Sequence, residues 1–294
     1  MTSLEQTLQS ILTPGKILAV YQLHYGDERG LVLTGEAARL QSSPDPSYAQ
    51  AFYDLIFDDI LVPLSKLPLK EILDVDLASI LLPPPEALNY TEQCLGLILI
   101  LDQTRAFTGG SYGARYTRCF FDPIAEGLVR QLVALPQDTR PDGKQAWLAR
   151  GYTFEQWLTR VFSIWAPLVH SDTFMVTERQ QVKDLLHSLR AEVEAHYKVT
   201  DPFAAREAAD DKDIYLFPRM VEEDLPKESF ADPSQPIAIW DYAFWYIRIM
   251  NAHFALTDTF GRYAYACQWK GNDPTEEERE YIEKTRDVFQ QPGK

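Results

Sequence analysis

Apolar residues recur at intervals of three and four positions along most of the chain, a spacing that places them on one face of an α-helix. The segments that show this period are 5–12, 16–25, 48–64, 88–107, 116–135, 153–169 and 237–260. Two further helices are predicted from capping signals. Thr177-x-x-Gln180 opens one as a capping box, and Asp273 followed by Pro274 opens the last, which runs to about Phe289.

Strand signals are sparse by comparison. Only residues 30–33 and 214–217 have the composition of strands, and neither has a partner with matching alternation. Residues 201–236 form an acidic, proline-containing stretch that is too long for an ordinary connection between helices. This stretch is either a surface excursion or a lid. We therefore predict an all-α fold in a single domain, 1–294, with 201–236 as an insertion loop.

The charge of the chain argues against two classes of partner. A net charge of −15 repels nucleic-acid phosphates and anionic lipid headgroups. The longest apolar run, 95–101, is too short to span a bilayer. The three cysteines are widely spaced without a Cys-x-x-Cys pair, and the N-terminus does not resemble a signal peptide. We expect a cytoplasmic protein without nucleic-acid partner or membrane span.

Sequence motifs for cofactors and metals are also missing. The chain has no Gly-rich dinucleotide or phosphate loop, no Gly-x-Ser-x-Gly elbow and no His-Glu-x-x-His motif. Its five histidines do not follow metal-ligand spacing. We expect neither cofactor nor metal. The high aromatic content, 12%, is compatible with a small-molecule partner in an apolar pocket, although most aromatic residues are expected in the core.

Three groups of residues, in this order, resemble the motifs of a known family. They are 95–103 with Gly110, Ala114-Arg115 and Phe121-Asp122; 167–172 with Glu178-Arg179; and 260–262 with 274–277. Together they are similar to the Leu-Leu-Asp-Gln, Gly-x-Ala-Arg, Met-His-Ser-Glu and Phe-Gly-Arg-Phe-Pro-His-Arg-Asn patterns of the largely bacterial "DUF-nine-twenty-four" family. The resemblance covers residues 21–289. It implies a tetratricopeptide-like helical array.

The departures from that family concern its polar residues. Thr104-Arg105-Ala106 stands in place of Phe-Pro-Arg-Asn, and Ala264-Tyr265-Ala266-Cys267 in place of Pro-His-Arg-Asn. A cavity that loses polar groups and keeps aromatic ones suits a larger apolar ligand. The chain in this respect resembles the fungal branch of tropolonic-sesquiterpene hetero-Diels–Alderases. The resemblance implies a cofactor-independent pericyclase that joins a tropolone o-quinone methide to a humulene-type sesquiterpene in natural-product biosynthesis.

Candidate site residues follow from placing charged and aromatic groups on this scaffold. Asp102 and Gln103 end an apolar helix, where a carboxylate needs a partner such as Arg105, Arg115 or Arg118. Asp102 is either part of a structural ion pair or an acid at a cavity. His170 is either a satisfied residue near a helix cap or a pocket residue.

The aromatic helix 237–260 offers two faces. One carries Tyr242, Tyr246, Ile249 and His253, and the other Trp240, Phe244, Ile247 and Asn251. We predict as catalytic His170, His253, Arg118 and Asp102. We predict as substrate-binding Gln103, Arg105, Tyr116, Trp157, Trp165, Trp240, Tyr242 and Tyr246.

A mechanism follows from these assignments. His170 or His253 acts as the general acid for loss of water, and an arginine polarises the quinone methide. The two alternatives are a non-catalytic helical-repeat interaction module and a small-molecule hydrolase or dehydratase on the same scaffold.

Overall fold

The computed structural model describes residues 3–26, 32–42, 46–103, 117–171, 176–222 and 236–285. Within these ranges every regular element is a helix and no residue lies in a β-strand. The predicted all-α fold is confirmed. Contacts group the chain into two compact units, Met1–Val32 with Ser43–Pro167, and Leu33–Ser42 with Leu168–Pro292. The single domain and the tetratricopeptide-like arrangement stay predictions.

The first unit is built around a buried helix. Its α-helices are α1 (Ser3–Ile11), α2 (Pro14–Tyr25), α4 (Pro46–Ile56), α5 (Val62–Leu64), α6 (Leu69–Leu73), α7 (Leu77–Leu81), α8 (Tyr90–Asp102), α11 (Asp122–Val133), α12 (Lys144–Leu148) and most of α13 (Phe154–Val169). Two π-helical segments, η1 (Phe57–Leu61) and η2 (Thr117–Phe121), precede α5 and α11. Every residue of α8 is buried, including the polar residues Thr91, Glu92 and Gln93 near its start, whereas its nearly all-apolar sequence predicted burial on most sides.

Close helix packing in this unit depends on a glycine. Helix α2 lies against α8. A Cβ atom added at Gly96 would lie 2.4 Å from the carbonyl oxygen of Ile17, so no side chain fits there. Helix α11 also packs against α8, and its apolar residues Leu128 and Leu132 are buried. Side-chain size at one position therefore sets how closely α2 approaches α8.

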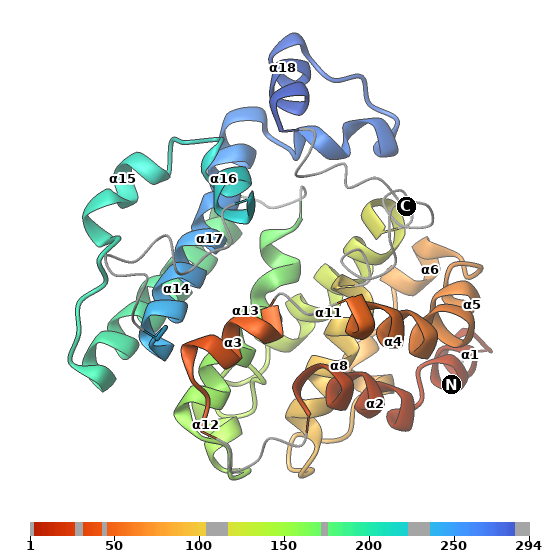
Figure 1. The fold of residues 1–294 in the computed structure, drawn as a ribbon. Helices are drawn as coiled ribbons and strands as arrows, with labels where there is room; N and C mark the ends of the chain where they lie inside the picture. Colours follow the sequence, from red (N-terminus) through yellow and green to blue (C-terminus); the bar gives the residue numbers. More distant parts are fainter. Residues whose placement is uncertain are drawn as a thin grey trace. The chain divides into compact units, whose positions relative to one another are not determined.

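The second unit is organised by two long helices. Its elements are α3 (Gly35–Ser42), α14 (Val176–Tyr197), η3 (Ala204–Arg206), α15 (Glu207–Asp210), α16 (Leu216–Glu222), α17 (Ile239–Phe260), η5 (Ala264–Lys270) and α18 (Glu276–Lys284). Helices α14 and α17 run side by side (Figure 1). Arg179 pairs with Asp258, and the Tyr197 ring lies 5.1 Å from that of Trp240, so the two helices are antiparallel.

The predicted insertion loop is wrong for its first part. Residues 201–222 fold into η3, α15 and α16. Arg190 Nε lies 2.7 Å from Asp201 Oδ2, and Arg248 Nε donates to Asp210 Oδ2 at 2.7 Å. These buried ion pairs tie the segment to α14 and α17, which local composition does not reveal. Residues 223–235 lie outside the described part of the chain.

The stretch 214–217, which has the composition of a strand, does not form one, because α16 begins at Leu216 and packs on α17. In the other candidate, 30–33, the described residues Val32 and Leu33 are not in a strand.

Two predicted helix starts shift as well. Thr177 is the second residue of α14 rather than its cap, and α18 is capped by Thr275 rather than Asp273. The Thr275 hydroxyl accepts from Glu278 N, and the Glu278 carboxylate accepts from Thr275 N, so both groups are satisfied within a capping box. Among the described residues, no helix combines the length and the hydropathy needed to cross a bilayer.

Candidate functional site

Two histidines that are far apart in the sequence lie next to each other in the second unit. His170 follows the last residue of α13, and His253 lies near the middle of α17. Their ring centroids are 5.4 Å apart, with an angle of 57° between the planes. Two imidazoles at this separation can act on the same small molecule, so this histidine pair is the centre of the candidate site.

The orientation of His253 is set by its own helix. Its Nδ1 donates to the carbonyl oxygen of Ile249 at 2.7 Å, one turn earlier. In the neutral ring this bond places the proton on Nδ1 and makes Nε2 the basic nitrogen. The side chain is 6% exposed, whereas His170 is only partly buried. His253 is therefore held in one orientation beside a more accessible imidazole.

Aromatic rings surround the histidine pair. The ring of Phe217, on α16, lies 3.9 Å from that of His253. The ring of Tyr263 meets His253 edge-on at 6.4 Å. Phe217 is partly exposed and Tyr263 is buried. Such a setting favours a flat, largely apolar ligand on which one or two polar atoms meet an imidazole.

The aromatic face of α17 continues from the histidine pair. Tyr246 and Ile249 share that face with His253, and both are partly exposed. Tyr242 is buried, with its ring 5.5 Å from that of Tyr246. Trp240 packs on Tyr197 instead. Of the three aromatic residues that were predicted on this helix, Tyr246 is the one that combines partial exposure with the face of His253.

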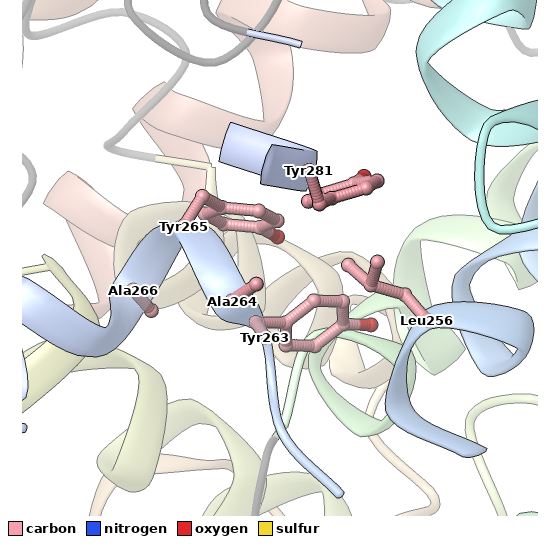
Figure 2. Packing of buried hydrophobic residues seen from close by; sticks show 6 residues of the cluster. All are labelled: Leu256, Tyr263, Ala264, Tyr265, Ala266 and Tyr281. Carbon is pink, nitrogen blue, oxygen red and sulfur yellow. The ribbon is translucent and has the colours of Figure 1, made fainter. Parts of the chain in front are cut away.

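The opposite face of α17 belongs to the core. Phe244, Ile247 and Asn251 are all buried. Residues 264–267, where the sequence departs from the pattern that it resembles, are buried too. Ala264, Ala266 and Cys267 of η5 are each 1% exposed, and Tyr265 packs with Tyr263 and Tyr281 (Figure 2). This motif therefore supports the end of α17 through core packing.

The predicted residues Asp102, Gln103 and Arg118 lie in the first unit. Asp102 is fully buried and accepts a hydrogen bond from Gln103 Nε2 at 2.5 Å. Arg118 lies on η2, and its guanidinium donates to Asp122 at 2.9 Å. Arg118 therefore has Asp122 as an ion-pair partner, and the two alternatives for Asp102 stay predictions. Arg105 and Tyr116 lie outside the described residues, and the convergence of Asp102 and Arg118 with the histidine pair stays a prediction.

Trp157 and Trp165 have a hydrogen-bonding role in the first unit. Trp157 Nε1 donates to the Asp142 carbonyl oxygen at 2.9 Å, and Trp165 Nε1 donates to the Asp142 carboxylate at 3.0 Å. Trp147 Nε1 donates to the Pro141 carbonyl oxygen at 2.6 Å. All three residues are buried; Trp157 and Trp165 hold Asp142 against α13, and Trp147 ties α12 to the turn that precedes it. A contribution of Trp157 and Trp165 to a substrate pocket stays a prediction.

Sequence reasoning missed a buried polar network in the first unit. Arg160 Nε donates to the Tyr21 hydroxyl at 3.0 Å, the Tyr21 and Tyr152 hydroxyls are 3.0 Å apart, and Tyr152 donates to Glu92 Oε1 at 3.0 Å. The Arg160 guanidinium also lies 4.4 Å from the Tyr25 ring centroid. The network links α2, α8 and α13 and balances two buried charges. The sequence feature that could have revealed the network is a charged residue within each of two apolar helices, Glu92 in α8 and Arg160 in α13.

Electrostatics around this network alter one histidine. Burial, with a smaller effect from the Arg160 charge, lowers the pKa of His24 to about 4. Burial likewise raises the pKa of the Tyr21 hydroxyl, which stays protonated. His24 Nδ1 forms a short hydrogen bond with the Tyr48 hydroxyl. His24 and Tyr21 are therefore neutral at pH 7, and their hydrogen bonds join α2 to Tyr48 on α4 and to Arg160 on α13.

No group of three or more histidine, cysteine or acidic side chains within the described ranges has the geometry of a metal site. Comparison with known proteins adds no relative: no family, no curated protein and no solved structure matches this chain. The family resemblance of its motifs therefore remains a prediction.

Proposed function

We propose that this chain is a cofactor-independent pericyclase. It would join a tropolone o-quinone methide to a humulene-type sesquiterpene by an intermolecular hetero-Diels–Alder reaction. The observation that carries the proposal is the pair of imidazoles, His170 and His253, whose centroids are 5.4 Å apart beside the rings of Phe217 and Tyr263. The family resemblance of the motifs supports the same substrate class.

The first step would be loss of water from a hydroxymethyl tropolone. His170, in its protonated form, would donate a proton to the departing hydroxyl group as the carbon–oxygen bond breaks. His253 Nε2 would accept the proton of the ring hydroxyl, which leaves the neutral o-quinone methide. A proton then returns from His253 to His170, so the pair ends in its starting state and one water has left.

The second step would form the dihydropyran ring without further proton transfer. The quinone methide supplies four atoms and the alkene of the terpene two, and two new bonds form as electrons shift around the ring. Tyr246, on the same face of α17 as His253, would hold the apolar partner. Orientation of two reactants contributes on the order of 7–11 kcal/mol in well-positioned systems, so it is expected to dominate the acceleration.

The proposal is tested with a hydroxymethyl tropolone and a humulene-type alcohol, with products separated by chiral chromatography. The protein should give one stereoisomer of the adduct faster than the background reaction. His170→Gln and His253→Gln should each slow quinone-methide formation by roughly 10²-fold or more. His196→Gln, on the exposed face of α14, is the matched control and should react like the unaltered protein. Tyr246→Ala should lower the stereoisomer ratio.

An unchanged rate and isomer ratio with and without protein would contradict this proposal. The interaction-module alternative would gain from that result. Hydrolysis or dehydration without adduct would instead favour the hydrolase or dehydratase alternative.

A further inference from the structure

One phenol in the second unit contacts His253 and the residue that directly precedes His170. Tyr263 lies just beyond α17, directly before η5, and is 1% exposed. Its ring meets His253 edge-on with the centroids 6.4 Å apart. Its hydroxyl donates a short hydrogen bond to the carbonyl oxygen of Val169. Val169 is the last residue of α13 and directly precedes His170.

The hydrogen bond acts on a part of α13 that needs a partner. The last carbonyl groups of an α-helix have no amide partner within the helix, and they must be satisfied from outside. Tyr263 supplies a donor at the point where the chain leaves α13. Because His170 is the next residue, the direction of its backbone depends on this contact. Packing of the ring in the cluster with Leu256 and Tyr281 fixes the phenol itself (Figure 2).

We propose that Tyr263 is a positioning residue for the imidazole pair. Through its ring it supports His253, and through its hydroxyl it holds the backbone that carries His170. It does not itself exchange a proton with substrate in this scheme. The inference rests on the proposed function for its catalytic consequence, although the geometric part stands on the histidine pair alone.

The test compares Tyr263→Phe with Tyr265→Phe. Both substitutions remove one buried phenol oxygen from the same cluster, but the Val169 contact belongs to Tyr263. The first measurement is the nuclear Overhauser effect between the ring protons of His170 and His253, in deuterated protein with protonated histidines. We expect Tyr263→Phe to weaken this signal several-fold and Tyr265→Phe to leave it unchanged.

The second measurement is turnover. Tyr263→Phe should lower kcat for quinone-methide formation by about tenfold, with KM for the terpene unchanged, because positioning is lost and binding is not. An unweakened ring-proton signal in Tyr263→Phe would overturn the inference. If Tyr263→Phe weakens the ring-proton signal but the unaltered protein has no turnover, Tyr263 positions the pair and the proposed function is refuted.

Discussion

Acidification should destabilise the folded protein partly through His24. This side chain is partly buried at the end of α2, its ring lies 4.5 Å from that of Tyr25, and the Arg160 guanidinium covers the same tyrosine. Burial first, and the Arg160 charge second, lower its pKa to about 4. Protonation of His24 in the folded state would place a second cation beside Arg160 in a poorly solvated position.

The size and the sign of the effect follow from the two protonation equilibria. An imidazole in an unfolded chain has a pKa of about 6.5. Because the folded pKa is lower, the unfolded chain takes up the proton first as the pH falls. The contribution of His24 to stability is therefore fully present above about pH 6.5, declines as the pH falls, and is lost below about pH 4. The total loss amounts to about 3 kcal/mol.

The assay is urea denaturation of the unaltered protein and of His24→Gln at several values between pH 7.5 and 4. Carboxylates titrate over part of this range in both proteins, so the difference between the two free energies of unfolding isolates His24. At neutral pH the variant should be less stable by about 1 kcal/mol, because it loses the hydrogen bond with Tyr48. Near pH 4 the His24→Gln variant should be more stable than the unaltered protein.

Tyr48→Phe is the control for this experiment. It removes the hydrogen bond but keeps the burial of the imidazole and the Arg160 charge, which are the two causes of the lowered pKa. Its stability should still fall between pH 6.5 and 4 by the same amount as that of the unaltered protein. Parallel curves for the unaltered protein and His24→Gln over this range would refute the reasoning.

Two further predictions concern packing and a helix cap. Gly96→Ala should lower the free energy of unfolding by about 1–3 kcal/mol, because the new Cβ would lie 2.4 Å from the Ile17 carbonyl oxygen. Gly127→Ala, whose Cβ would have nothing within 4 Å, should raise it by about 0.5–1 kcal/mol. Equal effects of the two substitutions in thermal unfolding would contradict this account. Glu278 has a pKa lowered to about 2, chiefly by hydrogen bonds from Arg262, so Glu278→Gln should cost about 1–3 kcal/mol at pH 7. That difference should shrink as the pH falls from 4.5 towards 2, and a constant difference in acid denaturation would argue against the ion pair.

Several elements followed from local pattern because their causes are local. The period of apolar residues predicted α13 over 153–169 and α17 over 237–260, and the structure has them at Phe154–Val169 and Ile239–Phe260. A helix needs only the residues within a turn of one another to form its hydrogen bonds. Short helices escaped prediction, since α15 and α16 depend on ion pairs and packing with α14 and α17.

In the candidate site, too, some features followed from local sequence and others did not. Helical spacing placed Tyr246 on the face of His253, and His170 was selected as a candidate from its position after an apolar helix. Polar partners followed local pattern only in part: Arg118 meets Asp122 four residues later, whereas the contact between Arg160 and the Tyr21 hydroxyl joins positions 139 residues apart.

Periodicity and composition thus settled the helical class of this protein, the buried α8 and the two faces of α17. Tertiary structure alone decided that His170 lies beside His253 and that Tyr263 reaches the end of α13. The reason is physical. Secondary structure is governed by neighbours along the chain, whereas the meeting of distant side chains depends on how whole helices pack, and that is set by the shapes of many residues at once.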